Sequence, residues 1–148
     1  MKYTIEISID MPREELIQLF DNSENLSKWQ EGLKSIELLE GEYGEEESTS
    51  RMVYAGRNSD LIIEGKVTKR NFPEEFCATY KSKGVYNEVV NLFSEPEPGR
   101  THWKMINYFR FGGMMIVMAP FIKSAFTSNT LLNMERFKVF AVQYKTTN

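Results

Sequence analysis

The two residue types best suited to metal binding or nucleophilic catalysis each occur once in this sequence, as His102 and Cys77. A zinc site needs several His or Cys ligands at set spacings, and a catalytic cysteine needs an activating base such as histidine. Cys77 lies in an apolar strand pattern, which is typical of a buried thiol, and His102 falls on the polar face of another strand. The sequence contains no Gly-x-Ser-x-Gly elbow, Walker loop or dinucleotide fingerprint. We therefore expect no metal, no cofactor and no catalytic residue of these kinds, and whether the protein is an enzyme stays open.

Asparagines on strand faces are candidates for ligand contact or for metal-free acid–base chemistry. Asn107 stands between Met105 and Phe109 on one face of its strand, so it either meets a ligand or is a satisfied packing partner. Asn87 and Asn91 share a face of another strand, and they point inward in only one of the two phases in which that strand can be read.

One arginine and two tyrosines are further candidates. Arg51 could anchor a ligand carboxylate through a bidentate pair, or it could form a surface ion pair with one of the many glutamates. Tyr54 and Tyr80 could each project a hydroxyl group inward. Burial in a cavity shifts the pKa of a tyrosine or a carboxyl group, so such side chains could take part in acid–base chemistry.

Alternation and turn residues predict the elements that must position these side chains. In residues 2–10, Tyr3, Ile5 and Ile7 alternate with polar residues, which is typical of a strand with one buried face. Pro12 ends that strand and suits the first turn of a helix. The expected elements are a strand over 2–10, short helices over 12–20 and 23–29, strands over 33–41, 47–56, 60–71, 75–83, 85–95 and 100–111, and a helix over 114–144.

The last strand and the long helix are expected to enclose the core between them. The inward face of the strand carries Trp103, Met105, Asn107, Phe109 and Phe111. The apolar stripe of the helix carries Phe126, Thr130, Met134, Phe137 and Ala141. Pro120 should kink the helix or start its main segment. The prediction is an α+β fold in which a seven-stranded antiparallel sheet curves around the C-terminal helix, with two short helices between the first two strands.

Three stretches of the sequence resemble the START-like superfamily, also called the SRPBCC or polyketide cyclase and lipid transport group. They are Ile7 to Phe20, Asp21 to Gly32, and Gly112 to Phe121 followed by Leu132 to Phe137. The resemblance covers essentially the whole chain and implies the helix-grip fold. Its motifs concern packing, and relatives include lipid, sterol and hormone binders, cyclases, ring oxygenase domains and a chaperone activator. The resemblance therefore implies a cavity and leaves its occupant open.

The cavity implied by the resemblance would be lined mainly by aromatic and methionine side chains, as ligand pockets usually are. A solid core is the alternative interpretation. The residues expected to line the cavity are Trp29, Arg51, Tyr54, Tyr80, Trp103, Met105, Asn107, Phe109, Met118, Phe121, Phe126 and Met134.

Three functions are compatible with these features. The leading one is binding or transport of a small hydrophobic ligand, lipid-like or polyketide-like. The second is a metal-free cyclase or dehydratase acting on a hydrophobic substrate. The third is a protein-interaction or chaperone-cofactor module that uses an exposed apolar patch at Met114 to Phe121, with contact to a membrane surface as a variant that the lack of flanking Lys or Arg clusters disfavours.

Length and charge set the remaining expectations. The 148 residues suit a single domain over 1–148, as a monomer or weak dimer. The net charge is −3 and the basic residues are scattered, which argues against nucleic-acid binding. The longest apolar stretch, Gly112 to Ile122, is too short to span a bilayer, so no integral membrane insertion is expected. The alternation in residues 1–10 is unlike the apolar region of a signal peptide, and together with the single cysteine it predicts a cytoplasmic protein.

Overall fold

The computed structural model describes residues 1–147 and contains every predicted strand and helix in the predicted order. The strands are β1 (Lys2–Ile9), β2 (Leu33–Glu40), β3 (Thr49–Tyr54), β4 (Leu61–Asn71), β5 (Glu75–Ser82), β6 (Val85–Glu97) and β7 (Arg100–Phe111). The helices are α1 (Arg13–Phe20), the 3-10 turn η1 (Ser23–Asn25), α2 (Leu26–Trp29) and α3 (Met115–Thr147). The predicted helix over 23–29 is thus a 3-10 turn followed by one α-helical turn.

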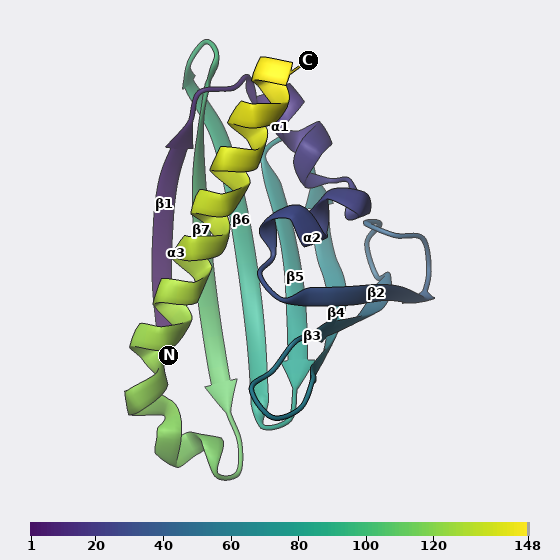
Figure 1. Ribbon diagram of the computed structural model, residues 1–148, viewed down its shortest axis with the longest axis vertical. Helices are drawn as coiled ribbons and strands as arrows, with labels where there is room; N and C mark the ends of the chain where they lie inside the picture. The colour runs from purple at the N-terminus through teal and green to yellow at the C-terminus, as the bar shows by residue number, and fades with distance from the viewer. Residues whose placement is uncertain (148) are drawn as a thin grey trace.

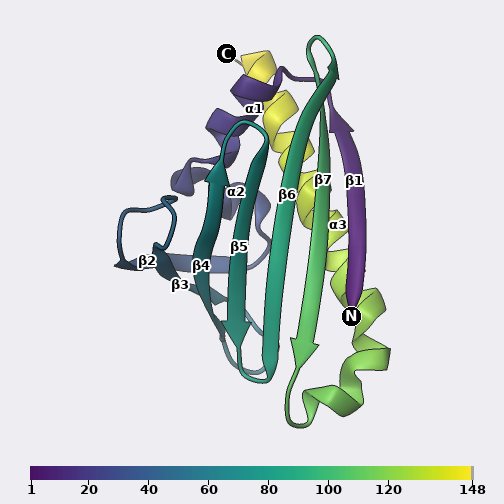
Figure 2. The same ribbon diagram turned by 180° about the vertical axis from the view of Figure 1, so that it is seen from behind.

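The seven strands form one antiparallel sheet in the order β1-β7-β6-β5-β4-β3-β2. Strands β2 to β7 follow one another as neighbours, and β1 closes the other edge by pairing with β7. The short helices α1 and α2 carry the chain from one edge of the sheet to the other (Figure 1). All helices lie on one side of the sheet, and the opposite side is bare (Figure 2). We call the helix-covered side the concave face and the other side the outer face.

Strand alternation decides which side chains reach the concave face. Ile5, Ile7 and Ile9 of β1 are buried there, and the register pairs Ile7 with Trp103 of β7. The inward face predicted for β7 is confirmed, because Trp103 and Asn107 are buried. Paired residues on neighbouring strands point to the same face of the sheet. The alternation in one strand therefore fixes which side chains of the next strand reach the concave face.

Helix α3 has two unequal parts. Its C-terminal part buries Met134, Phe137 and Ala141 completely, which confirms the predicted stripe. Pro120 lies inside the helix, and the turns that precede it run at an angle to the rest of α3 (Figure 1). The bend agrees with the predicted kink, since proline lacks the N–H that continues an α-helix. Only the part beyond the bend covers the sheet.

Candidate functional site

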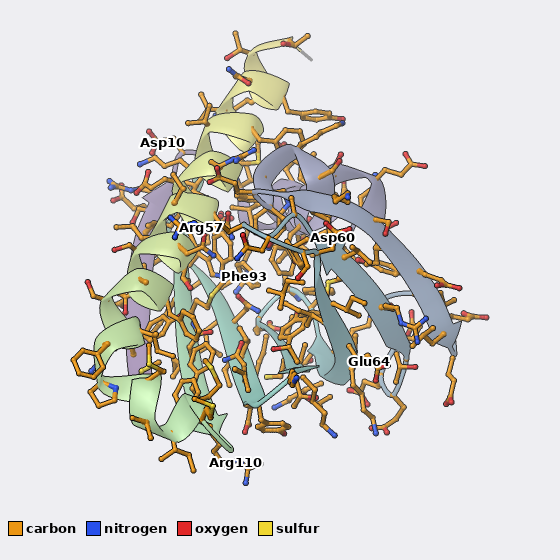
Figure 3. The ribbon with its side chains drawn as sticks, turned by 60° about the horizontal axis from the view of Figure 1, so that its bottom comes forward. Asp10, Arg57, Asp60, Glu64, Phe93 and Arg110 are labelled. Atoms are coloured by element: carbon orange, nitrogen blue, oxygen red, sulfur yellow. The ribbon has the colours of Figure 1, made fainter. Side chains whose placement is uncertain are left out.

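Aromatic rings fill the upper part of the concave face, where α1, α2 and the C-terminal part of α3 cover the sheet. Trp29 and Trp103 lie 5.2 and 5.4 Å from Phe137 between ring centroids, and Phe20 lies 5.7 Å from Trp103. Phe93 joins them and lies deep between α3 and the sheet (Figure 3). We call Phe20, Trp29, Phe93, Trp103 and Phe137 the aromatic core. Most of these ring pairs meet edge to face, while Phe93 stacks on Trp103 and Phe20 on Trp29; both arrangements are preferred by aromatic pairs.

Three residues predicted to line a cavity belong instead to this solid core. Trp103 and Met134 are completely buried and Trp29 nearly so. Trp29 and Trp103 pack against each other and against Phe137, so other rings of the core enclose them. The predicted cavity is absent at these three residues because packed rings fill the space between the sheet and the C-terminal part of α3.

In the lower part of the concave face, several inward side chains are only half-buried. Helix α3 packs on β1, β7 and α2, so the inner side of β3 to β5 lies beyond its cover. Phe109 and Phe126 lie 5.1 Å apart between ring centroids and are half-buried, as is Met105. Tyr54 and Tyr80 are half-buried on the facing strands. We call Tyr54, Tyr80, Met105, Asn107, Phe109 and Phe126 the concave site, and all six were predicted from the sequence.

Asn107 supplies an unused hydrogen-bond donor in this site. Its side chain is 3% exposed, and its Oδ1 accepts a hydrogen bond of 3.3 Å from the Nδ2 group of Asn87. The Asn107 Nδ2 group has no acceptor among residues 1–147. A buried amide left unpaired costs about 1–3 kcal/mol, so native proteins rarely keep one without a partner or a use.

Asn91, the neighbouring asparagine on β6, is fully satisfied. It donates to the Phe76 carbonyl over 3.2 Å and accepts 2.9 Å from the Trp103 indole Nε1. It therefore belongs to the structure of the aromatic core. Asn87 also faces inward, at the rim of the concave site, and its Nδ2 donates to the Tyr108 carbonyl at 3.2 Å as well as to Asn107.

Three tyrosines gather beside the lower part of the concave face. Burial raises the pKa of Tyr80 to about 12. Burial, and then the nearby Tyr80 and Tyr43, raise the pKa of Tyr54 far above its usual value. Burial, and then Tyr80 and Asp21, raise the pKa of Tyr43 to about 12. All three hydroxyls thus stay neutral near pH 7, where they donate and accept hydrogen bonds but do not act as bases.

Local structure explains how these rings are held. The Tyr54 hydroxyl donates 3.3 Å to Oε1 of Gln30. Tyr80 lies across Gly65 of β4, where a Cβ would come 3.1 Å from the ring and 3.1 Å from the Met52 methyl group. Tyr43 was not among the residues predicted from the sequence; it lies in the turn between Gly41 and Gly44. An aromatic residue between two turn glycines was the available signal.

Ionisation of these tyrosines should weaken the fold at alkaline pH. A tyrosine whose pKa is raised in the folded state contributes stability that is fully present below the unfolded value of 10.0 and is lost as pH rises toward about 12. Urea unfolding between about pH 9 and about pH 11 should show this loss, and Tyr80→Phe should reduce its slope. Tyr108→Phe is the matched control, since Tyr108 is exposed on the outer face. An unchanged slope in Tyr80→Phe would contradict the burial of its hydroxyl.

Arg51 does not reach the concave face, which corrects the prediction that it anchors a ligand carboxylate. The alternation of β3 buries Met52 inward and turns Arg51 outward, where it is exposed. Its guanidinium lies 3.6 Å from Glu64 and 3.9 Å from Glu37. The surface ion pair, the other interpretation of this residue, is what the structure shows.

Met118 and Phe121 do not line the concave site either. Both belong to the first turns of α3, before or just after Pro120, and they are 47% and 77% exposed. The bend in α3 carries these side chains away from the sheet, which corrects the prediction that they line a cavity.

Metal and thiol chemistry find no support among residues 1–147. No group of three or more His, Cys, Asp or Glu side chains converges there. His102 lies on the outer face as predicted, with Nε2 2.9 Å from Glu6. Cys77 is buried as predicted, and burial, followed by the Glu75 carboxylate, raises its pKa to about 12, so it stays an unreactive thiol.

The sheet order and the helix laid across it define the helix-grip fold, and the resemblance to START-like proteins is confirmed at the level of the fold. A conserved protein from Geobacillus kaustophilus superposes with a TM-score of 0.80 at 15% identity, over 97% of this chain and 96% of that one. Zhui aromatase/cyclase from a Streptomyces species gives 0.80 at 8% identity, over 97% and 94%. Ara h 8.0201 gives 0.73 at 13% identity, over 97% and 98%. No family model and no curated protein matches the sequence.

Proposed function

We propose that this protein binds a small, mostly apolar molecule carrying a hydrogen-bond acceptor, and that the molecule lies in the concave site. The proposal rests on the buried Nδ2 group of Asn107, which has no hydrogen-bond acceptor among residues 1–147. A ligand oxygen placed against this group would remove the cost of leaving it unpaired. The donor therefore selects for an acceptor at one defined position of the ligand.

The surroundings of Asn107 suit an apolar ligand body. Met105, Phe109 and Phe126 are half-buried, so part of their apolar surface remains available. The neutral hydroxyl of Tyr80 offers a second polar contact on the facing strand. This mixture of aromatic surface and a few polar groups is typical of small-molecule sites. A similar fold occurs in an aromatase/cyclase, which supports a polyketide-like or lipid-like molecule as the ligand.

We propose that the protein binds and transports this molecule and does not change it chemically. The tyrosines have raised pKa values and do not serve as bases at neutral pH. Glu64, Glu75 and Glu88 alternate with the inward residues and lie on the outer face. Proton abstraction would need such a group beside the ligand. We further propose a cytoplasmic location, for which the single buried Cys77 gives support.

Native mass spectrometry of the purified protein tests the proposal directly, since a bound molecule adds a defined mass that organic extraction removes. Anilinonaphthalene sulfonate, an apolar fluorophore with acceptor oxygens, then serves as a probe of the site. Asn107→Leu should weaken probe binding about tenfold, because the leucine offers no donor. Lys104→Gln, on the outer face of the same strand, should leave the affinity unchanged.

Two results would overturn the proposal. One is a protein that carries no extractable molecule and does not bind the fluorophore. The other is equal probe affinity in Asn107→Leu and the unmodified protein, which would show that the unpaired amide has no part in recognition.

A further inference from the structure

The first turns of α3 expose large apolar side chains to solvent. Met114, Ile116, Val117, Met118 and Phe121 are 85%, 60%, 72%, 47% and 77% exposed. We call these five residues the apolar tip. A contiguous exposed apolar group of this kind marks an interaction site, because it is costly to keep in water.

Basic side chains from β5, the β5–β6 turn, β7 and α3 itself lie at the same end of the molecule as the tip. The turn between β5 and β6 contacts the start of α3, with the Gly112 N–H donating 3.0 Å to the Gly84 carbonyl. A Cβ at Gly84 would come 2.9 Å from Met115 Cγ. The end of β5 carries Lys81 and the turn into β6 carries Lys83. Arg110 stands next to the last residue of β7 (Figure 3), and α3 adds Lys123. We call these four residues the basic rim.

The charge of the rim is not neutralised locally. None of its four residues forms an ion pair within residues 1–147, whereas Arg51, Lys66 and Arg70 do. The sequence from 98 to 134 contains no acidic residue, although the whole protein has a net charge of −3. The rim therefore contributes four positive charges, unpaired within residues 1–147, at this end of an acidic protein.

Two shallow depressions on the outer face adjoin the rim. One, of about 430 Å³, is lined by Lys2, Arg110, Tyr86 and Tyr108 together with Glu88. The other, of about 340 Å³, is lined by Lys81, Ser82, Gly84 and Arg110 among others. The Arg110 guanidinium lies 4.5 Å from the centroid of the Tyr86 ring, which holds it beside both depressions.

We propose that this end of the protein docks on an anionic lipid membrane. The apolar tip enters the boundary between headgroups and acyl chains, and the basic rim binds lipid phosphates. Apolar side chains buried about 5–10 Å deep, with cations at headgroup level, are the physical pattern of interfacial binding. The sequence disfavoured this contact for lack of flanking basic clusters, but the fold assembles one from three separated segments.

The helix geometry favours a bilayer surface over a protein groove. Ile116, Val117 and Met118 are consecutive and all exposed, so several sides of the helix are apolar, which suits immersion better than docking through one face. Helix α3 is the one helix within residues 1–147 whose length and composition would let it cross a membrane. Its C-terminal part buries Phe137 and Ala141 in the core, so only the tip is free to enter lipid.

Co-sedimentation with phosphatidylcholine–phosphatidylserine vesicles tests this proposal. We expect binding that weakens with salt and is lost on pure phosphatidylcholine vesicles. The double substitution Val117→Ser and Phe121→Ser should weaken binding about tenfold, because less apolar surface is buried in the membrane. Lys83→Glu with Arg110→Glu should weaken it by a similar factor through charge.

Matched controls separate this surface from the rest of the protein. Val139→Ser lies on the same helix and is exposed, and Arg100→Glu reverses a charge at the opposite end of the sheet, so both should bind vesicles normally. Asn107→Leu should also bind them, which keeps the test independent of the concave site. Failure to bind anionic vesicles would overturn the proposal. So would tip variants that bind normally, or dimerisation in sedimentation experiments that uses the tip in place of lipid.

Discussion

Replacing Phe137 with alanine should lower the free energy of unfolding by about 3–5 kcal/mol, the largest effect that we expect from a single substitution. Phe137 is completely buried and touches rings of three other elements, with centroids at 5.2 Å to Trp29, 5.4 Å to Trp103 and 6.2 Å to Phe20. Alanine removes the ring that joins α3 to α1, α2 and β7. Because rigid aromatic neighbours collapse poorly into a void, the cavity cost adds to the lost transfer energy.

Urea unfolding followed by circular dichroism measures this change. Val139→Ala is the matched control, since it shortens an exposed side chain two residues further along the same helix and should change stability by less than about 0.5 kcal/mol. A loss below about 1.5 kcal/mol in Phe137→Ala would mean that the upper concave face is adaptable space, as a ligand cavity would be, and not a solid core.

The elements were predictable because one face of the sheet is buried. In β1 and β7 apolar and polar residues alternate, so only one face of each strand can be the buried one. Pro12, Gly84 and Gly113 mark the positions at which one element ends and the next begins. The phase of β3 was harder to read. Its sequence places Val53 on one face and Met52 on the other, so apolar residues mark both, and only pairing with β4 turns Arg51 outward.

The division between core and site was not predictable from periodicity. The alternation of β7 shows that Trp103 and Phe109 share a face. It does not show that Trp103 is completely buried by other rings whereas Phe109 is only half-buried. That depends on where α1 and α2 insert Phe20 and Trp29, and on the bend at Pro120. The basic rim was not predicted for a related reason, since Lys81 and Arg110 are far apart in the sequence and line the same depression only because β5, β6 and β7 are neighbours in the sheet.

Two asparagines on the same concave face should respond in opposite ways to the same substitution. Asn91→Leu should lower the free energy of unfolding by about 2–3 kcal/mol, because it leaves the buried Trp103 indole N–H and the Phe76 carbonyl without their partner. Asn107→Leu should change it by less than about 0.5 kcal/mol or raise it, since the substitution removes a donor that has no acceptor. Asn87, which loses one acceptor in that variant, keeps the Tyr108 carbonyl.

This contrast separates a structural asparagine from a functional one. Thermal and urea unfolding of the two variants, measured without ligand, give the comparison, and probe binding gives the reverse ranking if Asn107 meets a ligand. A destabilisation of Asn107→Leu as large as that of Asn91→Leu would show that the Asn107 amide is paired in the folded protein and serves the sheet. Equal or greater stability together with lost binding is the signature of a group kept for recognition, because stability alone would favour the apolar side chain at that position.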